Sequence, residues 1–412
     1  MYRFNFALLF LVVIGCNRRP EVEKLEVMNV VPNVQPSGGA YFTQDHLGNP
    51  VLCWTAGEEG NGQLCFATYD NASESFEKPV LVLPSKGTGL HSESMNKVAF
   101  KADGTIIAVF ERKQPTEKNK YAGSILFSQS FDNGKTWTSE KFLHTDTTSN
   151  SRSFFDIASL PDGEVGAVWV DGRLQLGESG SSLFFSKTKD HEGFTQDRQI
   201  GETVCECCRT DLYTDPMGNV HVLYRDIESS IKGQIRDFAH AISLDSGATF
   251  STSHKVSEDN WNIDGCPHTG ASMSENLNGL VVVWFTAGGL PGLYYTFSSD
   301  KGNTFQKRQL ISEQARHPQI ASNGSELMIV WDESKQQSHQ MHAGHGVKDT
   351  QSNNSTVLAV LDIQNNVSVK NIVDRGGEFP VLSVTNSKGV LVAYTKNKQV
   401  VVRRVKHEGL IR

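Results

Sequence analysis

The sequence lacks the features that mark several common functional classes. Its 412 residues carry a formal net charge of −7 and contain no Lys/Arg-rich run, so nucleic acid is not an expected partner. No recognisable motif for a nucleotide, a flavin or a calcium loop is present. Leucine is sparse whereas glycine is frequent, with 36 residues, and this balance favours β-structure with many turns.

The first sixteen residues differ in character from the rest of the chain. Arg3 gives a positively charged start, and the apolar run Phe6–Ile14 is too short to span a bilayer as a helix. The run leads into "VIGC", which ends at Cys16 and resembles the bacterial lipobox, where the cysteine is lipidated and becomes the first residue. We therefore expect a lipoprotein signal peptide over residues 1–15 and a lipidated tether over residues 16–23, which gives stable membrane anchoring.

That interpretation places the protein in the bacterial cell envelope, at the outer membrane or the cell surface. Asn17 stands where an aspartate would signal retention in the inner membrane. The alternative is an ordinary secretory signal in which Cys16 occurs by chance. The lipid anchor is the only membrane contact that the sequence predicts.

Two repeats run along the remaining chain. "SFDNGKTW" (130–137), "SLDSGATF" (243–250) and "SSDKGNTF" (298–305) share the pattern Ser-x-Asp-x-Gly-x-Thr-aromatic, and their aspartates lie 113 and 55 residues apart. Because 113 is about twice 55, a further copy is expected near residue 188, where "TKDHEGF" is a degenerate match. The second repeat is a glycine turn followed by a β-branched run that ends in an aromatic residue. These aromatic residues are Trp54, Phe110, Trp169, Tyr224, Trp284, Trp331 and Tyr394.

A period of about 50–60 residues with several strands per unit predicts a β-propeller. We expect an all-β fold with seven four-stranded blades in a single domain over residues 24–412. The last unit has only three strands, and the spare strand at residues 24–30 can complete it and close the ring. A six-bladed ring with an extra hairpin is the alternative.

The Ser-x-Asp-x-Gly-x-Thr-aromatic turns resemble the Asp-boxes of the sialidase (BNR-repeat) superfamily. The Asp carboxylate can accept backbone N–H groups of its own turn, the Gly permits positive φ, and the aromatic packs between blades. The resemblance implies a structural role on the outer rim, away from any active site. The Asp-box residues are Asp132, Gly134, Trp137, Asp245, Gly247, Phe250, Asp300, Gly302 and Phe305.

The same resemblance implies a glycan ligand, sialic-acid-like or another acidic sugar, at the top-face loops of blades three to six. Enzymes of the superfamily hold a substrate carboxylate with three arginines and use a Tyr nucleophile with a Glu and an acid/base Asp. The substrate-binding candidates are Arg152, Arg209, Arg225, Arg236 and Arg316, and the catalytic candidates are Tyr224, Asp156 and Glu228. The Arg-Ile-Pro motif of the family is absent, and no Tyr/Glu pair is evident, so exo-sialidase-like hydrolysis and simple binding both stay open.

Six cysteines remain after Cys16, an even number that favours disulfides in an exported protein. Cys53 and Cys65 lie on adjacent expected strands and are either a disulfide or two small buried residues. The loops before blades four and five carry the others, and these form either a disulfide staple or a thiolate/imidazole site for zinc or copper. The candidate ligands are Cys205, Cys207, Cys208, Cys266 and His268. A third hypothesis is a non-catalytic scaffold without a cofactor that binds a protein partner.

Overall fold

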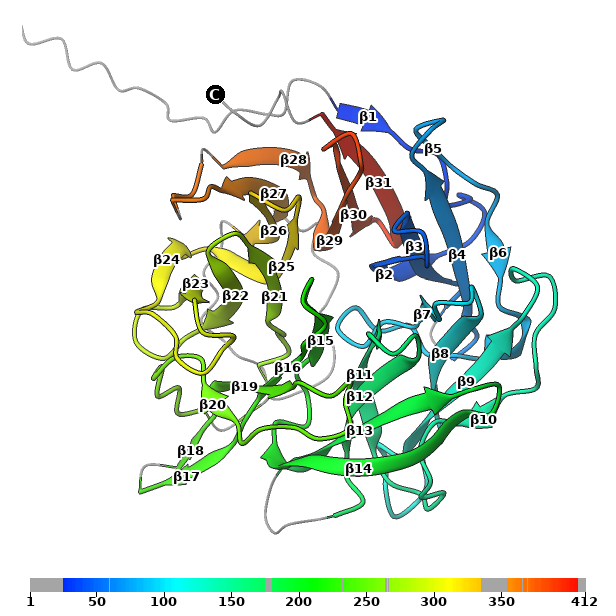
Figure 1. Cartoon of the computed structure of the whole chain (residues 1–412), viewed down its shortest axis with the longest axis horizontal. Helices are drawn as coiled ribbons and strands as arrows, with labels where there is room; N and C mark the ends of the chain where they lie inside the picture. The colour runs from blue at the N-terminus through cyan, green and yellow to red at the C-terminus, as the bar shows by residue number, and fades with distance from the viewer. Residues whose placement is uncertain are drawn as a thin grey trace, which may run out of the picture.

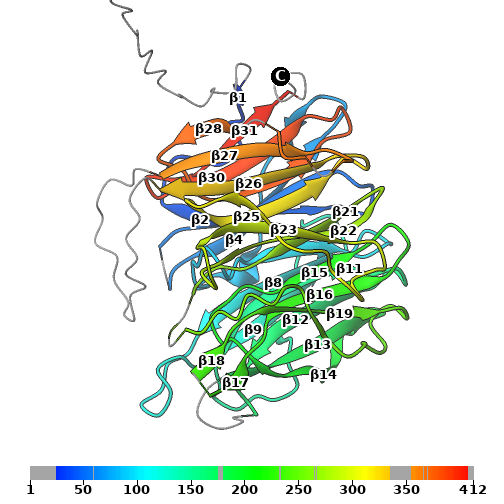
Figure 2. The same ribbon diagram turned by 90° about the vertical axis from the view of Figure 1, so that its left-hand side faces the viewer.

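The computed structural model describes residues 25–406, apart from residues 59, 175–179, 232, 264, 266, 335–353, 365 and 369. Seven small antiparallel sheets surround a central channel, which makes the protein a seven-bladed β-propeller (Figure 1). The first strand of each blade lies nearest the channel, and the later strands follow outward (Figure 1). Figure 2 shows the same ring from the side. Within the described residues no helix has the length and apolarity that a membrane span requires.

The first three blades run in chain order around the ring. Blade 1 consists of β2 (Ser37–Gln44), β3 (Pro50–Ala56), β4 (Gln63–Asp70), β5 (Ser75–Phe76) and β6 (Val80–Leu81), followed by the short 3-10 helix η1 (Leu83–Ser85). Blade 2 consists of β7 (Lys97–Phe100), β8 (Ile106–Lys113), β9 (Gly123–Ser130) and β10 (Lys141–Phe142). Blade 3 consists of β11 (Arg152–Ser159), β12 (Val165–Asp171), β13 (Ser181–Lys189) and β14 (Gly193–Val204).

The next three blades continue the ring, and blade 4 carries an extra hairpin. Blade 4 consists of β15 (Asp211–Thr214), β16 (Val220–Arg225), β19 (Phe238–Ser243) and β20 (His254–Lys255), with the hairpin β17 (Glu228–Ser230) and β18 (Gly233–Ile235). Blade 5 consists of β21 (Ser272–Asn276), β22 (Gly279–Thr286), β23 (Gly292–Ser298) and β24 (Gln309–Ser312). Blade 6 consists of β25 (Ala315–Ser322), β26 (Leu327–Ser334), β27 (Asn354–Leu361) and β28 (Asn371–Arg375).

Blade 7 closes the ring with strands from both ends of the chain. It consists of β29 (Glu378–Val384), β30 (Val390–Lys396), β31 (Gln399–Val405) and the N-terminal strand β1 (Leu25–Val27). β1 pairs antiparallel with β31, so that Leu25 lies opposite Val405. The closure removes a free sheet edge and confirms the seven-bladed ring over the six-bladed alternative.

The core lies between neighbouring blades rather than in the channel. The second strand of each blade carries the aromatic residue of the long repeat, and all seven of these side chains are buried. Three of the tryptophans also donate their indole N–H to an acid: Trp169 to Asp171, Trp284 to Asp259 and Trp331 to Glu333. Because these strands are covered on both faces, their sequences are apolar without alternation.

The Asp-box turns connect the third and fourth strands of their blades. Asp132 accepts the backbone N–H of Thr136 at 2.8 Å and its hydroxyl at 2.7 Å, and the other two boxes repeat both bonds. Gly134 has a φ of 79°, and a Cβ there would meet Val80 of the previous blade at 2.8 Å. The motif's aromatic residue packs on that previous blade too, as in the 4.9 Å contact of Phe250 with Phe185. The boxes therefore join neighbouring blades.

Candidate functional site

The innermost strands begin with a repeated backbone irregularity. Residues at equivalent positions in four blades adopt a left-handed conformation, with φ between 48° and 59°: Gly39, Phe154, His317 and Phe379. In blades 1, 3, 6 and 7 the strand register shifts at this point, which is the signature of a β-bulge. A left-handed conformation costs a residue other than glycine about 1–3 kcal/mol, and such strain gathers at functional sites.

Three of these bulges take part in aromatic contacts between neighbouring blades at the channel mouth. The ring of His317 lies 4.1 Å from that of Phe379, and His91 contacts Phe154 edge-on at 5.4 Å. His268 is exposed. The mouth of the channel is therefore lined partly by histidine and phenylalanine side chains that the bulges position.

Arg209 spans the channel and ties four blades together. Its Nη1 donates to Glu93 of the loop before blade 2 at 3.1 Å, and both side chains are buried. Its Nη2 donates to two carbonyls, that of Ala271 just before blade 5 and that of Pro318 in the first strand of blade 6. Glu93 uses its other oxygen to accept the N–H of Gly270. This guanidinium is therefore held by groups of the protein itself.

Three more of the predicted arginines are also buried and bound by the protein. Arg152 pairs with Asp171 at 3.1 Å in blade 3. Arg225 donates to the carbonyls of Arg236, Thr269 and Phe285. Arg225 also lies over the rings of Phe238 and Trp261. Arg316, in contrast, is exposed, and its guanidinium lies 5.1 Å from the Phe285 ring. The structure brings Arg225 and Arg236 together, but Arg152 belongs to a separate network.

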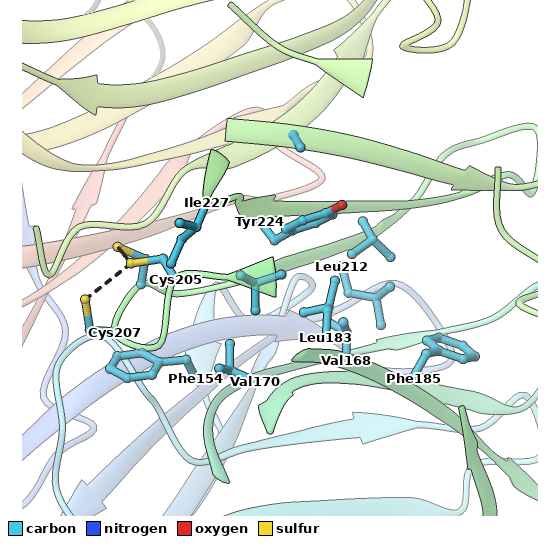
Figure 3. Close-up of a cluster of buried hydrophobic side chains, with 14 of the residues drawn as sticks. Phe154, Val168, Val170, Leu183, Phe185, Cys205, Cys207, Leu212, Tyr224 and Ile227 are labelled. Carbon is cyan, nitrogen blue, oxygen red and sulfur yellow. Dashed lines mark hydrogen bonds between the residues drawn. The ribbon is translucent and has the colours of Figure 1, made fainter. Parts of the chain in front are cut away.

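The predicted catalytic residues lie in different surroundings. Tyr224 lies in an apolar cluster with Leu183 and Leu212, and burial raises its pKa to about 12 (Figure 3). Glu228 is exposed on β17 and binds Lys255 at 2.6 Å. Tyr224 and Glu228 share no contact among those of the described residues.

Asp156 lies in a polar cluster of the innermost strands. Its carboxylate accepts the Lys97 ammonium at 2.8 Å, the Tyr41 hydroxyl at 3.0 Å and the Leu212 N–H at 2.8 Å. Burial and the nearby charge of Asp156 raise the pKa of Asp211 to about 7. Sequence reasoning missed Asp211 and Glu93, although both fall within or beside loops that it had assigned to the top face.

Three cysteine side chains converge in the loop between β14 and β15. The Cys205 sulfur lies 3.4 Å from that of Cys207 and 3.7 Å from that of Cys208, and all three sulfurs lie within 4.8 Å of one another (Figure 3). A disulfide bond measures about 2.05 Å, whereas a tetrahedral ion with bonds of about 2.3 Å holds its thiolates roughly 3.8 Å apart. The separations thus match thiolates around one ion.

The loop is fixed by contacts with blade 4. The Cys205 N–H donates to the carbonyl of Arg225, and the Ile227 N–H donates to that of Thr203. Phe154 of blade 3 packs on the other side of the cysteines in the same buried cluster. The cysteines therefore lie between blades 3 and 4 and away from solvent.

The surroundings of the three sulfurs are cationic. Arg236 Nη1 lies 3.1 Å from the Cys205 sulfur. Burial opposes ionisation of Cys208, but hydrogen bonds from Cys205 and Cys207 and the charge of Arg225 hold its pKa well below its usual range. Burial raises the pKa of Cys205. Among the described residues, the buried Nε atoms of Arg225 and Arg236 and the buried Thr269 hydroxyl have no hydrogen-bond partner. Unpartnered buried donors of this kind suit an anionic group nearby.

The predicted partners of these cysteines are not all placed. Cys266 and Cys16 lie outside the described residues. His268 lies in the described chain but is not among the groups that meet the three sulfurs. The only metal-ligand cluster in the described part of the chain is therefore Cys205, Cys207 and Cys208.

The prediction of disulfides is not supported, because none joins the five described cysteines. Trp54 pairs with Cys65, and Cys53 pairs with Phe66. Cys53 and Cys65 therefore point to opposite faces of the sheet, and they pack in separate apolar clusters. The hypothesis of two small buried residues fits these positions.

Comparison with known proteins shows the fold. No protein-family model and no curated protein matches the chain. Among solved structures, a protein of unknown function from Dyadobacter fermentans DSM 18053 is 15% identical with a TM-score of 0.50, over 78% of this chain and 96% of that one.

This protein is a seven-bladed β-propeller. The Hadza microbial sialidase Hz136 aligns at 11% identity over 86% of this chain and 75% of that one, with a TM-score of 0.47. The Penicillium chrysogenum alpha-L-arabinanase aligns at 14% over 78% and 97%, with a TM-score of 0.46. At these identities the likenesses concern the fold alone.

Proposed function

We propose that this propeller binds one soft transition-metal ion, copper(I) or zinc(II), through the thiolates of Cys205, Cys207 and Cys208. The convergence of three buried sulfur atoms within 4.8 Å carries the proposal. Sulfur ligands select Cu(I) and zinc over hard cations such as Ca²⁺ or Mg²⁺. The ion would be held between blades 3 and 4, beside the channel mouth.

Charge supports the assignment. Three thiolates leave a net charge of −2 around Cu(I) and −1 around Zn²⁺, and burying such a complex is costly unless cations accompany it. Arg225 and Arg236 are both buried beside the sulfurs. Their Nε atoms, which have no hydrogen-bond partner in the described part of the chain, supply further donors. The arginines predicted to bind a substrate carboxylate would here compensate thiolate charge and tune the ion from outside its ligand shell.

The test is the metal content of the purified protein, prepared under reducing conditions without chelator. We expect about one equivalent of copper or zinc by elemental mass spectrometry. Cys207→Ser and Cys208→Ser should lose it, whereas Cys65→Ser, a buried cysteine in blade 1, should retain it. Because a serine variant can fail to fold, the wild type is also loaded with Co²⁺ and examined for thiolate charge-transfer absorption. Metal-free protein without that absorption, or metal that survives both substitutions, would overturn the proposal.

A second function is favoured by one observation at the same face. Arg316 is an exposed cation whose guanidinium lies over an aromatic ring, that of Phe285. An exposed guanidinium suits an acidic sugar, because the sugar presents a carboxylate that can accept its charge-assisted hydrogen bonds. We therefore also propose that the top face binds an acidic glycan, with hydrolysis as its enzymatic form. Arg316→Ala should abolish retention on a panel of immobilised acidic glycans, and unchanged retention would contradict this proposal.

The envelope location is a proposal of its own. The lipobox-like "VIGC" supports anchoring through Cys16. Metabolic labelling with a fatty acid should tag the wild-type chain and spare a Cys16→Ala variant. Labelling of both variants would contradict it.

A further inference from the structure

His317 occupies a strained position at the channel mouth. It lies in β25 with a φ of 48°, in the left-handed region that glycine adopts freely. Blade 1 has a glycine, Gly39, at the equivalent bulge. The fold thus accepts glycine here, yet blade 6 presents an imidazole.

Asp332 of the neighbouring strand β26 orients this imidazole. The Nδ1 atom of His317 lies 2.9 Å and 3.1 Å from the two carboxylate oxygens of Asp332. One of those oxygens also accepts the N–H of Phe379 at 2.9 Å, which ties the pair to blade 7. With Nδ1 bound to the carboxylate, Nε2 is the ring nitrogen left to face a ligand. Among the described residues Nε2 makes no hydrogen bond or ion pair, and 17% of the His317 side chain is exposed.

Three charged groups act on the imidazole from the elements around it. Asp332 faces it from β26, Glu93 from the loop before blade 2, and Arg316 precedes it in the chain. Burial and Arg316 oppose protonation, but the two carboxylates outweigh them, so that the pKa of His317 is raised. Glu93 already binds Arg209 and the N–H of Gly270, so it remains an electrostatic neighbour of His317.

We infer that His317 and Arg316 form an anion-binding site at the channel mouth, which takes the carboxylate of an acidic sugar or of another small organic acid. The Nε2–H of the imidazolium and the N–H groups of the guanidinium would each donate a charge-assisted hydrogen bond. Phe285 packs against the guanidinium and Phe379 against the imidazole, and these contacts help to hold the two cations in place. The choice of an acidic sugar rests on the second function proposed above, whereas the anion site itself does not.

The test is a titration of the purified protein with glucuronate, glucose and acetate, followed by NMR of the His317 ring and by calorimetry. We expect glucuronate to bind, glucose to fail, and glucuronate binding to weaken about tenfold between pH 6 and pH 8.5 as the imidazole loses its proton. His317→Asn should abolish binding. Because asparagine tolerates the left-handed region well, this variant should still fold, which its urea unfolding curve checks.

Asp332→Asn separates a positioning role from a merely structural one. It keeps an acceptor for Nδ1 and removes the charge, so binding should be lost at pH 7 and recovered at lower pH. Equal affinities for acetate and glucuronate would support the anion site and show that the sugar ring adds nothing to binding. If glucuronate affinity is independent of pH and unchanged in His317→Asn, the His317 site is wrong, although the glycan proposal still stands. Absence of any shift of the His317 ring with either acid would overturn the inference.

Discussion

The Arg209 guanidinium meets the Glu93 carboxylate at 3.1 Å across the centre of the propeller, although the two residues are 116 positions apart in the chain. Arg209 directly follows the cysteine motif and was a candidate for binding a substrate carboxylate. The carboxylate that it binds in the structure belongs to the protein. The ion pair links the loops before blades 2 and 4, and its carbonyl and N–H contacts extend the link to blades 5 and 6.

Breaking this pair should destabilise the whole ring. Removing one partner of a buried ion pair leaves an uncompensated charge and costs about 3–5 kcal/mol. We expect Glu93→Gln and Arg209→Gln each to lower the free energy of unfolding by that order in urea titrations. The double variant should lose less than the sum, because the charges compensate each other.

Glu140→Gln provides the matched control. It breaks the exposed pair of Arg112 and Glu140, which is worth at most about 1 kcal/mol. Equal losses from Glu93→Gln and Glu140→Gln would show that the channel pair contributes no more than a surface one.

Acid should weaken the junction of blades 4 and 5 through two buried histidines. His221 Nδ1 and His240 Nε2 lie 2.9 Å apart. Burial, followed by the charge of His221, lowers the pKa of His240 to about 3, and burial lowers that of His221 despite Asp215. An unfolded histidine titrates near 6.5. The unfolded chain therefore binds more protons between about pH 6.5 and 3, and stability falls as the pH drops through that window.

The measurement is the urea midpoint from pH 7.5 to pH 4.5. The wild type should lose stability on acidification, and His240→Phe should lose less, because it removes one of the groups that must stay neutral. His254→Gln changes an exposed histidine next to His240 and serves as control. Parallel curves for wild type and His240→Phe would rule out this histidine as a source of the acid sensitivity.

The two cysteines of blade 1 should be inert in the folded protein. Burial raises the pKa of Cys53 to about 12 and that of Cys65 to about 11, and only the thiolate reacts. Neither should react with a thiol reagent at pH 8 until the protein unfolds in urea. Cys53→Ala and Cys65→Ala should each lower the number of reacting thiols by one in the unfolded protein. Neither should change the number that react in the folded protein. Rapid native labelling that either substitution abolishes would contradict their burial.

The register of blade 1 shows where sequence reasoning fails. The runs that contain Cys53 and Cys65 were identified as adjacent strands, and the structure pairs them. A shift of one residue in the pairing, however, moves a side chain to the other face. The apolar pattern of a strand buried on both faces gives no signal for that choice.

For the candidate site, the sequence likewise predicted which segments contribute but not which side chains meet. The sequence indicated that cysteines and arginines concentrate in the top-face loops, because loops between regular repeats are easy to locate. It did not indicate that Arg236 would meet Cys205 or that Asp332 would orient His317. Asp332 directly follows Trp331, the aromatic residue that ends a repeated run, and Asp171 comes two residues after the equivalent Trp169 in blade 3. An acid just after the repeat aromatic is the signal that could have pointed to Asp332.

The sequence by itself determined the blade number, the Asp-box turns and the closing strand. Those features depend on local turn chemistry and on a spacing of apolar runs that repeats along the chain. Only the tertiary structure decided which polar groups meet, such as Arg209 with Glu93 or the three sulfurs with one another. The physical reason is that residues at the centre of the ring come from different blades, and their contacts depend on the stacking of all seven blades and on the bulges that begin the inner strands.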